Sequence, residues 1–97
     1  MKYRKKPVII EAVKLPYHEW ADNPLEFEET PEWLRIAVED KVVVPVFKGE
    51  DYWYYQIETL EGTLTAKPSD MLIQGVEGEL YFCEASIFQK TYEAVND

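Results

Sequence analysis

The sequence is poor in the residues that most often carry enzyme chemistry. Its 97 residues include one cysteine, Cys83, and one histidine, His18. A single cysteine excludes an internal disulfide bond and is typical of a reducing compartment. A structural zinc site needs four nitrogen or sulfur ligands, so we expect no metal site. A nucleophilic Cys–His pair requires contact between these two residues, and nothing in their spacing predicts that contact.

The chain also has few glycines and no membrane-length apolar run. Gly75 and Gly78 lie between expected strands, so neither belongs to a glycine-rich phosphate loop before a helix. The apolar run Val8–Ile10 is too short for a signal-peptide core or a membrane span. The acidic residues show no readable pair for acid–base catalysis. We therefore expect a non-enzymatic protein without a cofactor, not bound to membranes and located in the cytoplasm of a bacterial host cell.

The charge is strongly negative and unevenly placed. The net charge is −9, but residues 1–6 hold four of the ten basic residues and no acidic residue. The acidic remainder predicts no direct nucleic-acid binding, because phosphate binding needs clustered lysine and arginine. The basic start is interpreted as protection of a strand edge. A contact with phosphate or with an acidic partner is the alternative.

The spacing of β-branched and aromatic residues predicts one α+β domain over residues 1–97, with mainly antiparallel strands. We expect an antiparallel meander or a partly open barrel, with one helix over residues 31–39 covering an open face or end. The expected strands are 6–15, 42–47, 52–60, 63–66, 71–73 and 80–83.

The expected helix has a recognisable start. Thr30 can accept from a free backbone N–H, Pro31 suits the first helical position, and Glu32 meets the positive end of the helix dipole. The candidates for its inward face, at helical spacing, are Trp33, Leu34, Ile36 and Ala37.

Three further local signals are informative. Ser86 and Gln89 have capping-box spacing, which predicts a short C-terminal helical turn over about 87–90. Pro45 places its strand at a sheet edge or at a bulge. Glu61-Gly62 predicts a tight hairpin turn, because glycine can adopt a positive φ.

Several short motifs occur in a fixed order in the outer parts of the chain. The start reads Met1-Lys2-Tyr3-Arg4-Lys5-Lys6-Pro7-Val8 and Ile10-Glu11-Ala12, and the second half has Thr59-Leu60-Glu61-Gly62, Lys67-Pro68-Ser69-Asp70, Gly75-Val76-Glu77-Gly78-Glu79-Leu80-Tyr81, Ile87-Phe88 and Thr91-Tyr92-Glu93. In order and spacing these motifs resemble a family of small phage and prophage proteins. That family typically reads T-L-E-G, P-G-D-Y, G-V-x-G-E-x-Y-P-C and F-x-x-T-Y-E, in this order. The resemblance covers roughly residues 1–14 and 59–95, and it implies a phage or prophage origin and an accessory role. It transfers no catalytic residue. Ser69 stands where the family has glycine, which predicts a type I turn there.

The aromatic cluster at residues 52–55 is the strongest positive signal. On a strand, two of its four rings must point away from the core-facing side. Outward aromatic rings on a small domain are typical of an interface, although a sheet covered on both sides would also hold them. Two aromatic residues beside the acidic loop over 17–30 complete the expected surface. The candidate interaction surface is Tyr52, Trp53, Tyr54, Tyr55, Trp20 and Tyr17.

Three functions stay open on this evidence. The leading hypothesis is a phage- or prophage-encoded interaction module that binds a protein partner or itself. A second is an acidic inhibitor that mimics nucleic acid and blocks a host protein, as the acidic body would allow. A third is a small-ligand binder in a β-barrel pocket lined by Trp53 and Tyr55.

Overall fold

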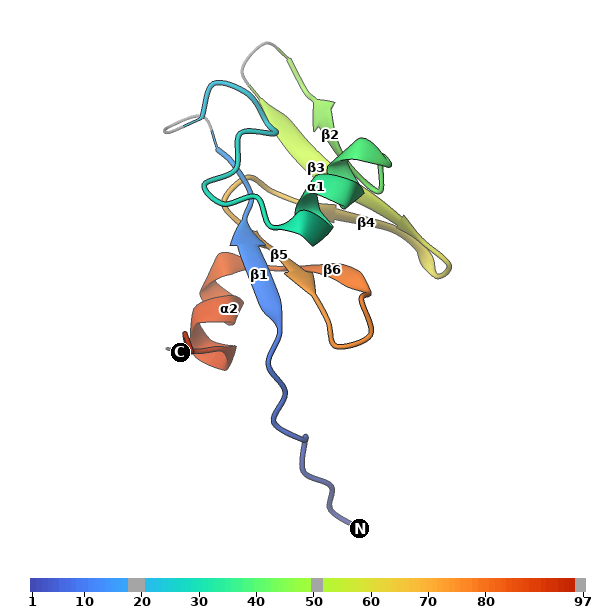
Figure 1. Cartoon of the computed structure of the whole chain (residues 1–97), viewed down its shortest axis with the longest axis vertical. Coiled ribbons are helices and arrows are strands. Elements are labelled where there is room, and N and C mark those ends of the chain that lie inside the picture. The colour runs from blue at the N-terminus through green and yellow to red at the C-terminus, as the bar shows by residue number, and fades with distance from the viewer. Residues whose placement is uncertain (18–20, 50–51, 96–97) are drawn as a thin grey trace.

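The computed structural model describes residues 1–17, 21–49 and 52–95, and its architecture is α+β. Within these residues, two helices accompany two small antiparallel sheets (Figure 1), which confirms the expected α+β fold class. The elements are β1 (Glu11–Lys14), α1 (Glu32–Glu39), β2 (Val43–Phe47), β3 (Trp53–Thr59), β4 (Gly62–Ala66), β5 (Met71–Gln74), β6 (Leu80–Cys83) and α2 (Ala85–Thr91).

The six described strands form two separate sheets rather than a barrel. One sheet is the meander β2-β3-β4, and the other has the order β1-β5-β6. The predicted meander is therefore correct for the first sheet, and the described strands do not close into a barrel. The reason lies in the connection after β4, since the chain turns there into β5, which pairs with β1 instead of extending the meander.

The first strand is shorter than predicted. It was expected over residues 6–15, but β1 covers only Glu11–Lys14, and residues 1–9 are exposed. The pairing partner sets this length, because the four residues of β5 pair with β1 from Glu11↔Gln74 to Lys14↔Met71. The β-branched residues before β1 therefore have strand propensity but no strand beside them. Figure 1 shows this segment leaving the body of the molecule.

One hydrophobic core cluster joins both sheets and α1. Tyr55 is completely buried in it, together with Leu34 of α1 and Leu72 of β5. Each layer therefore buries its apolar side against the others, as two-layer domains require. The buried members of the cluster are Val13, Leu15, Leu34, Ala37, Val43, Trp53, Tyr55, Ile57, Ala66 and Leu72.

Helix α1 starts one residue later than its sequence signal suggests. Pro31 is extended (φ −62°, ψ 161°) and is the N-cap residue, so Thr30 lies outside the helix and the predicted threonine cap is wrong. The Pro31 carbonyl accepts hydrogen bonds from the backbone N–H groups of Leu34 (3.0 Å) and Arg35 (3.1 Å). The proline thus begins the helix through its carbonyl and its fixed φ.

The inward stripe of α1 also differs from the prediction. Leu34 and Ala37 are buried, and Trp33 packs against the core. Ile36 was expected to face inward but is 44% exposed. Leu34 and Ala37 are three residues apart and share one helix face, whereas Ile36 lies to the side of it.

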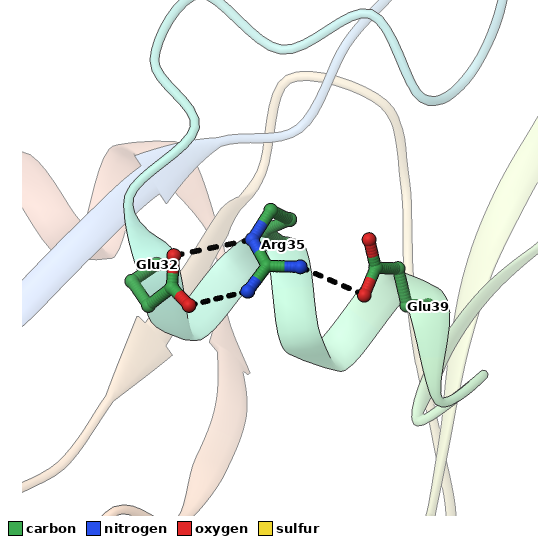
Figure 2. Close-up of polar contacts among 3 residues, drawn as sticks. All are labelled: Glu32, Arg35 and Glu39. Carbon is green, nitrogen blue, oxygen red and sulfur yellow. Dashed lines mark hydrogen bonds and ion pairs between the residues drawn. The ribbon is translucent and has the colours of Figure 1, made fainter.

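The solvent side of α1 carries a three-residue ion-pair network (Figure 2). Arg35 donates through Nε to Oε2 of Glu32 (3.1 Å), and its Nη2 contacts Oε1 of the same carboxylate. Its Nη1 donates to Oε2 of Glu39 (2.8 Å). One guanidinium therefore links the first and last turns of the helix at i,i+3 and i,i+4 spacing.

Helix α2 is capped by a residue distant in sequence. It begins at Ala85 after Glu84, so Ser86 lies inside the helix and the predicted capping box is wrong. The Asp70 carboxylate accepts instead from the backbone N–H of Ala85 (3.3 Å) and from that of Lys67 (3.1 Å). Asp70 thus ties the turn before β5 to the start of α2.

The turn at Ser69 departs from its prediction. Ser69 has a φ of 72°, and the Asp70 N–H donates to the Lys67 carbonyl (3.2 Å). A positive φ at the third residue of a turn belongs to type II geometry, so the predicted type I turn is wrong. The Ser69 N–H also donates to the Leu15 carbonyl (2.9 Å), and this bond holds the strained residue in place.

Of the two local predictions for the meander, the edge position of Pro45 is confirmed and the hairpin turn lies one residue away from its predicted place. Pro45 lies in β2, which is an edge strand, as predicted. The hairpin turn is displaced by one residue, because its two-residue loop is Leu60-Glu61 and Gly62 follows with a φ of 127°.

Candidate functional site

The aromatic residues 52–55 divide between the core and the surface. Trp53 and Tyr55 are 7% and 0% exposed, whereas Tyr52 is 67% exposed and Tyr54 is half-buried. The predicted alternation is therefore correct. Since Trp53 and Tyr55 belong to the core, the outward side of the cluster is carried by Tyr52 and Tyr54.

The two core rings are joined by a buried hydrogen-bond network. Trp53 Nε1 donates to the Tyr55 hydroxyl (2.9 Å) and lies 3.2 Å from the Pro16 carbonyl oxygen. The Tyr55 hydroxyl lies 2.9 Å from that same oxygen and 2.7 Å from the Pro24 carbonyl oxygen, so its single proton is donated to one of the two. Burial raises the pKa of Tyr55, and the hydrogen bond from Trp53 partly opposes that rise. These groups attach the loop after β1 to β3.

A groove of about 900 Å³ runs beside the outward rings. Tyr52 and Tyr54 contribute to one wall, and Phe82 and Cys83 of β6 contribute to another. The groove therefore lies where the meander approaches the second sheet. Its lining residues are Lys48, Tyr52, Trp53, Tyr54, Thr65, Ala66, Lys67, Pro68, Asp70, Phe82, Cys83 and Glu84.

The groove combines aromatic rings with charge of both signs. Lys48 and Lys67 line it, although the protein as a whole carries a net charge of −9. Of the two acidic residues in the lining, Asp70 already accepts two backbone N–H groups. The arrangement suits binding of an apolar or aromatic group next to a carboxylate.

The thiol in the groove is a weak candidate for chemistry. Burial raises the pKa of Cys83, and the carboxylates of Asp70 and Glu84 raise it further. A raised pKa lowers the thiolate fraction and with it the nucleophilicity near neutral pH. The only histidine, His18, lies outside the described residues.

The remaining two candidates lie apart from the groove or outside the described chain. Tyr17 is half-buried beneath Lys14, whose Nζ is 5.5 Å from the ring centroid, and it is absent from the groove lining. Trp20 lies outside the described residues. The structure thus brings together Tyr52, Trp53 and Tyr54 of the predicted surface but not Tyr17.

The sequence analysis did not single out three residues that define the groove. Lys48 and Lys67 follow two strands of the meander, and Phe82 comes from the other sheet. The sequence carried only a weak indication of the two lysines, since they are basic residues in an otherwise acidic body, and none of Phe82. Only the approach of the two sheets shows that they share a groove.

Two features are absent from the described part of the chain. Within residues 1–17, 21–49 and 52–95, there is no group of three histidine, cysteine, aspartate or glutamate side chains placed to hold a metal ion. In the same ranges, no helix has the length and apolar character needed to cross a membrane.

Comparison of the chain with protein-family models, curated proteins and solved structures finds no match. The resemblance to the phage family therefore stays a prediction, and the groove must be interpreted from its own geometry.

Proposed function

We propose that this chain is a phage- or prophage-encoded, non-enzymatic interaction module that binds a partner protein through the groove. The observation that carries the proposal is the position of Tyr52 and Tyr54, whose outward rings line a groove between two sheets. Tyrosine supplies a large amphipathic contact area at low conformational-entropy cost, which is why it is enriched at interfaces. The motif resemblance supports the phage origin, and the single cysteine supports a reducing host cytoplasm.

The chemistry of the groove favours one kind of partner segment. Lys48 and Lys67 supply positive charge beside the rings, within a protein that is otherwise acidic. A partner segment with an apolar or aromatic side chain next to a carboxylate would place the side chain against the tyrosine rings and the carboxylate near the lysines. Complementary charge of this kind directs encounter and orientation more than it adds affinity.

The same groove supports a second candidate, a small-ligand binder. Its volume of about 900 Å³ lies within the usual size of ligand sites, roughly 300–1,000 Å³. However, it lies between two sheets rather than inside a barrel, and Tyr55 is in the core rather than in its lining. A small ligand would need to be held by Trp53 and the outward tyrosines instead.

The test of the leading proposal is selective capture of proteins from a bacterial host lysate. The protein is immobilised as wild type, as Tyr52→Ala/Tyr54→Ala and as Tyr3→Ala. Tyr3 is a matched control because it is 89% exposed and lies in the N-terminal segment. We expect a protein retained by wild type and by the Tyr3 variant but weakened at least about tenfold by the double variant, as for interface hot spots.

A retained set that is identical for all three forms would refute the proposal. Retention of small molecules alone, detected by native mass spectrometry of the wild-type protein and absent from the double variant, would favour the second candidate.

A further inference from the structure

Strand β4 is an edge strand without the usual protection against pairing. The order β2-β3-β4 leaves the outer side of both outer strands without a hydrogen-bonded strand, although β4 also contacts β6. Pro45 protects β2, but β4 reads Gly62-Thr63-Leu64-Thr65-Ala66 and contains neither a charge nor a proline. Its first four residues are exposed. Such an edge is a template for another strand.

The hairpin geometry shows which backbone groups of β4 are directed outward. The two-residue loop is closed by the pair Thr59↔Gly62, and residues flanking such a loop form a hydrogen-bonded pair. Hydrogen bonding to β3 then alternates along β4. Thr63 and Thr65 therefore direct their N–H and C=O groups away from β3, where a new strand would lie.

The charges that flank β4 select one pairing register. Glu61 and Lys67 are both exposed, and each is three residues from Leu64. If a second β4 pairs antiparallel around Leu64, Glu61 lies opposite Lys67 of the second copy, and the same pair forms at the other end. Thr63 then faces Thr65 of the second copy, a cross-strand combination that stabilises sheets. Shifting the register by two residues removes both charge pairs.

We propose that two copies of this chain associate edge to edge through β4, antiparallel and centred on Leu64, to form a continuous six-stranded sheet. The contact is self-complementary, as a two-fold dimer requires. The contact also covers Leu64, which is 38% exposed in the single chain. The edge of β6 is less suitable, because Glu79 and Glu84 flank it and would place like charges together.

The test is sedimentation equilibrium with charge reversals at the two ends of β4. We expect wild-type protein to dimerise with concentration. Glu61→Lys alone and Lys67→Glu alone each replace two attractive pairs with two repulsive ones, so each should raise the dimer Kd by roughly tenfold. The double variant Glu61→Lys/Lys67→Glu restores opposite charges and should return the Kd to the wild-type value. An equimolar mixture of the two single variants should dimerise as a heterodimer.

Two controls separate this contact from other effects. Glu77→Lys makes the same charge change in the β5–β6 turn and should leave the Kd unchanged. Tyr52→Ala removes a ring from the proposed partner groove and should also leave the dimer Kd unchanged. Lys67 lines that groove but Glu61 does not, so Glu61→Lys tests the dimer contact without changing the groove, and the two proposals can fail separately. A wild type that stays monomeric at millimolar concentration overturns the proposal. The proposal is also overturned if the single charge reversals leave the dimer Kd unchanged, or if the double variant does not return the Kd to the wild-type value.

Discussion

At the scale of single residues, Tyr55 shows how this small core accommodates a polar group. Its ring is completely buried, and its hydroxyl lies within hydrogen-bond distance of two prolyl carbonyls and one indole N–H. Buried polar groups are costly unless they are satisfied. Here the Tyr55 hydroxyl accepts the hydrogen bond of the Trp53 indole N–H in β3 and donates to a prolyl carbonyl in the loop after β1.

We expect Tyr55→Phe to destabilise the protein by about 1–3 kcal/mol, because it leaves a buried carbonyl without its donor. The measurement is urea unfolding followed by circular dichroism. Tyr3→Phe, at an exposed position, is the matched control and should change the free energy of unfolding by less than about 0.5 kcal/mol. Equal midpoints for the two variants would show that the network contributes no net stability.

The placement of this ring was predictable, but its hydrogen-bond partners were not. Alternation along a strand was sufficient to place Trp53, Tyr55 and Ile57 on one face, and all three are buried. The carbonyls of Pro16 and Pro24 meet the hydroxyl only because the loop folds over β3. Nothing local to Tyr55 encodes that approach.

At the scale of elements, α1 is held from both sides. Leu34 and Ala37 bury its inner face, and Arg35 connects Glu32 with Glu39 on its outer face. The hydrogen bond from Arg35, followed by its charge, holds the pKa of Glu32 below the ordinary value of 4.5.

This lowered pKa has a definite consequence for pH dependence. Because the folded pKa of Glu32 lies below 4.5, its ion pair stabilises the helix above that pH and the contribution is lost as the pH falls through the folded pKa. We expect Arg35→Met to return the Glu32 pKa to its ordinary value. The measurement is an NMR titration of the side-chain carboxyl carbons, with Arg4→Met as the control. A Glu32 pKa that is the same in wild type and in Arg35→Met would contradict the assignment.

The two helix starts show the limit of local signals at this scale. Capping needs an acceptor near free N–H groups, and any part of the chain can supply it. At α2 the acceptor is Asp70, distant in sequence, and Ser86 is not used as predicted. The sequence therefore predicts that a helix exists more reliably than it predicts what caps it.

At the scale of the whole molecule, the two sheets share one core. Leu72 of β5 is completely buried in the same cluster as Val43 and Tyr55 of the meander. If the chain is a single domain, as the sequence predicts, both sheets must unfold together.

We expect Leu72→Ala to lower the free energy of unfolding by about 2–5 kcal/mol, through lost apolar burial and the cavity that is left. Tryptophan fluorescence and far-ultraviolet circular dichroism should report one coincident transition in the variant, as in a two-state domain. Val76→Ala, at an exposed position, should change stability by less than about 0.5 kcal/mol. If fluorescence and circular dichroism gave different unfolding midpoints, the two sheets would unfold independently.

The sequence by itself determined the features that depend on neighbouring residues. The side-chain alternation at residues 52–55, the hairpin near Gly62, the edge position of Pro45 and the helix after Pro31 all follow from backbone geometry within a few residues. The tertiary structure alone decided the rest. The strands form two sheets, and β1 is only as long as the strand that pairs with it. The cap of α2 is Asp70, and a groove lies beside Tyr52. Each of these depends on which distant segments meet, and that choice depends on the burial of a shared core rather than on local pattern.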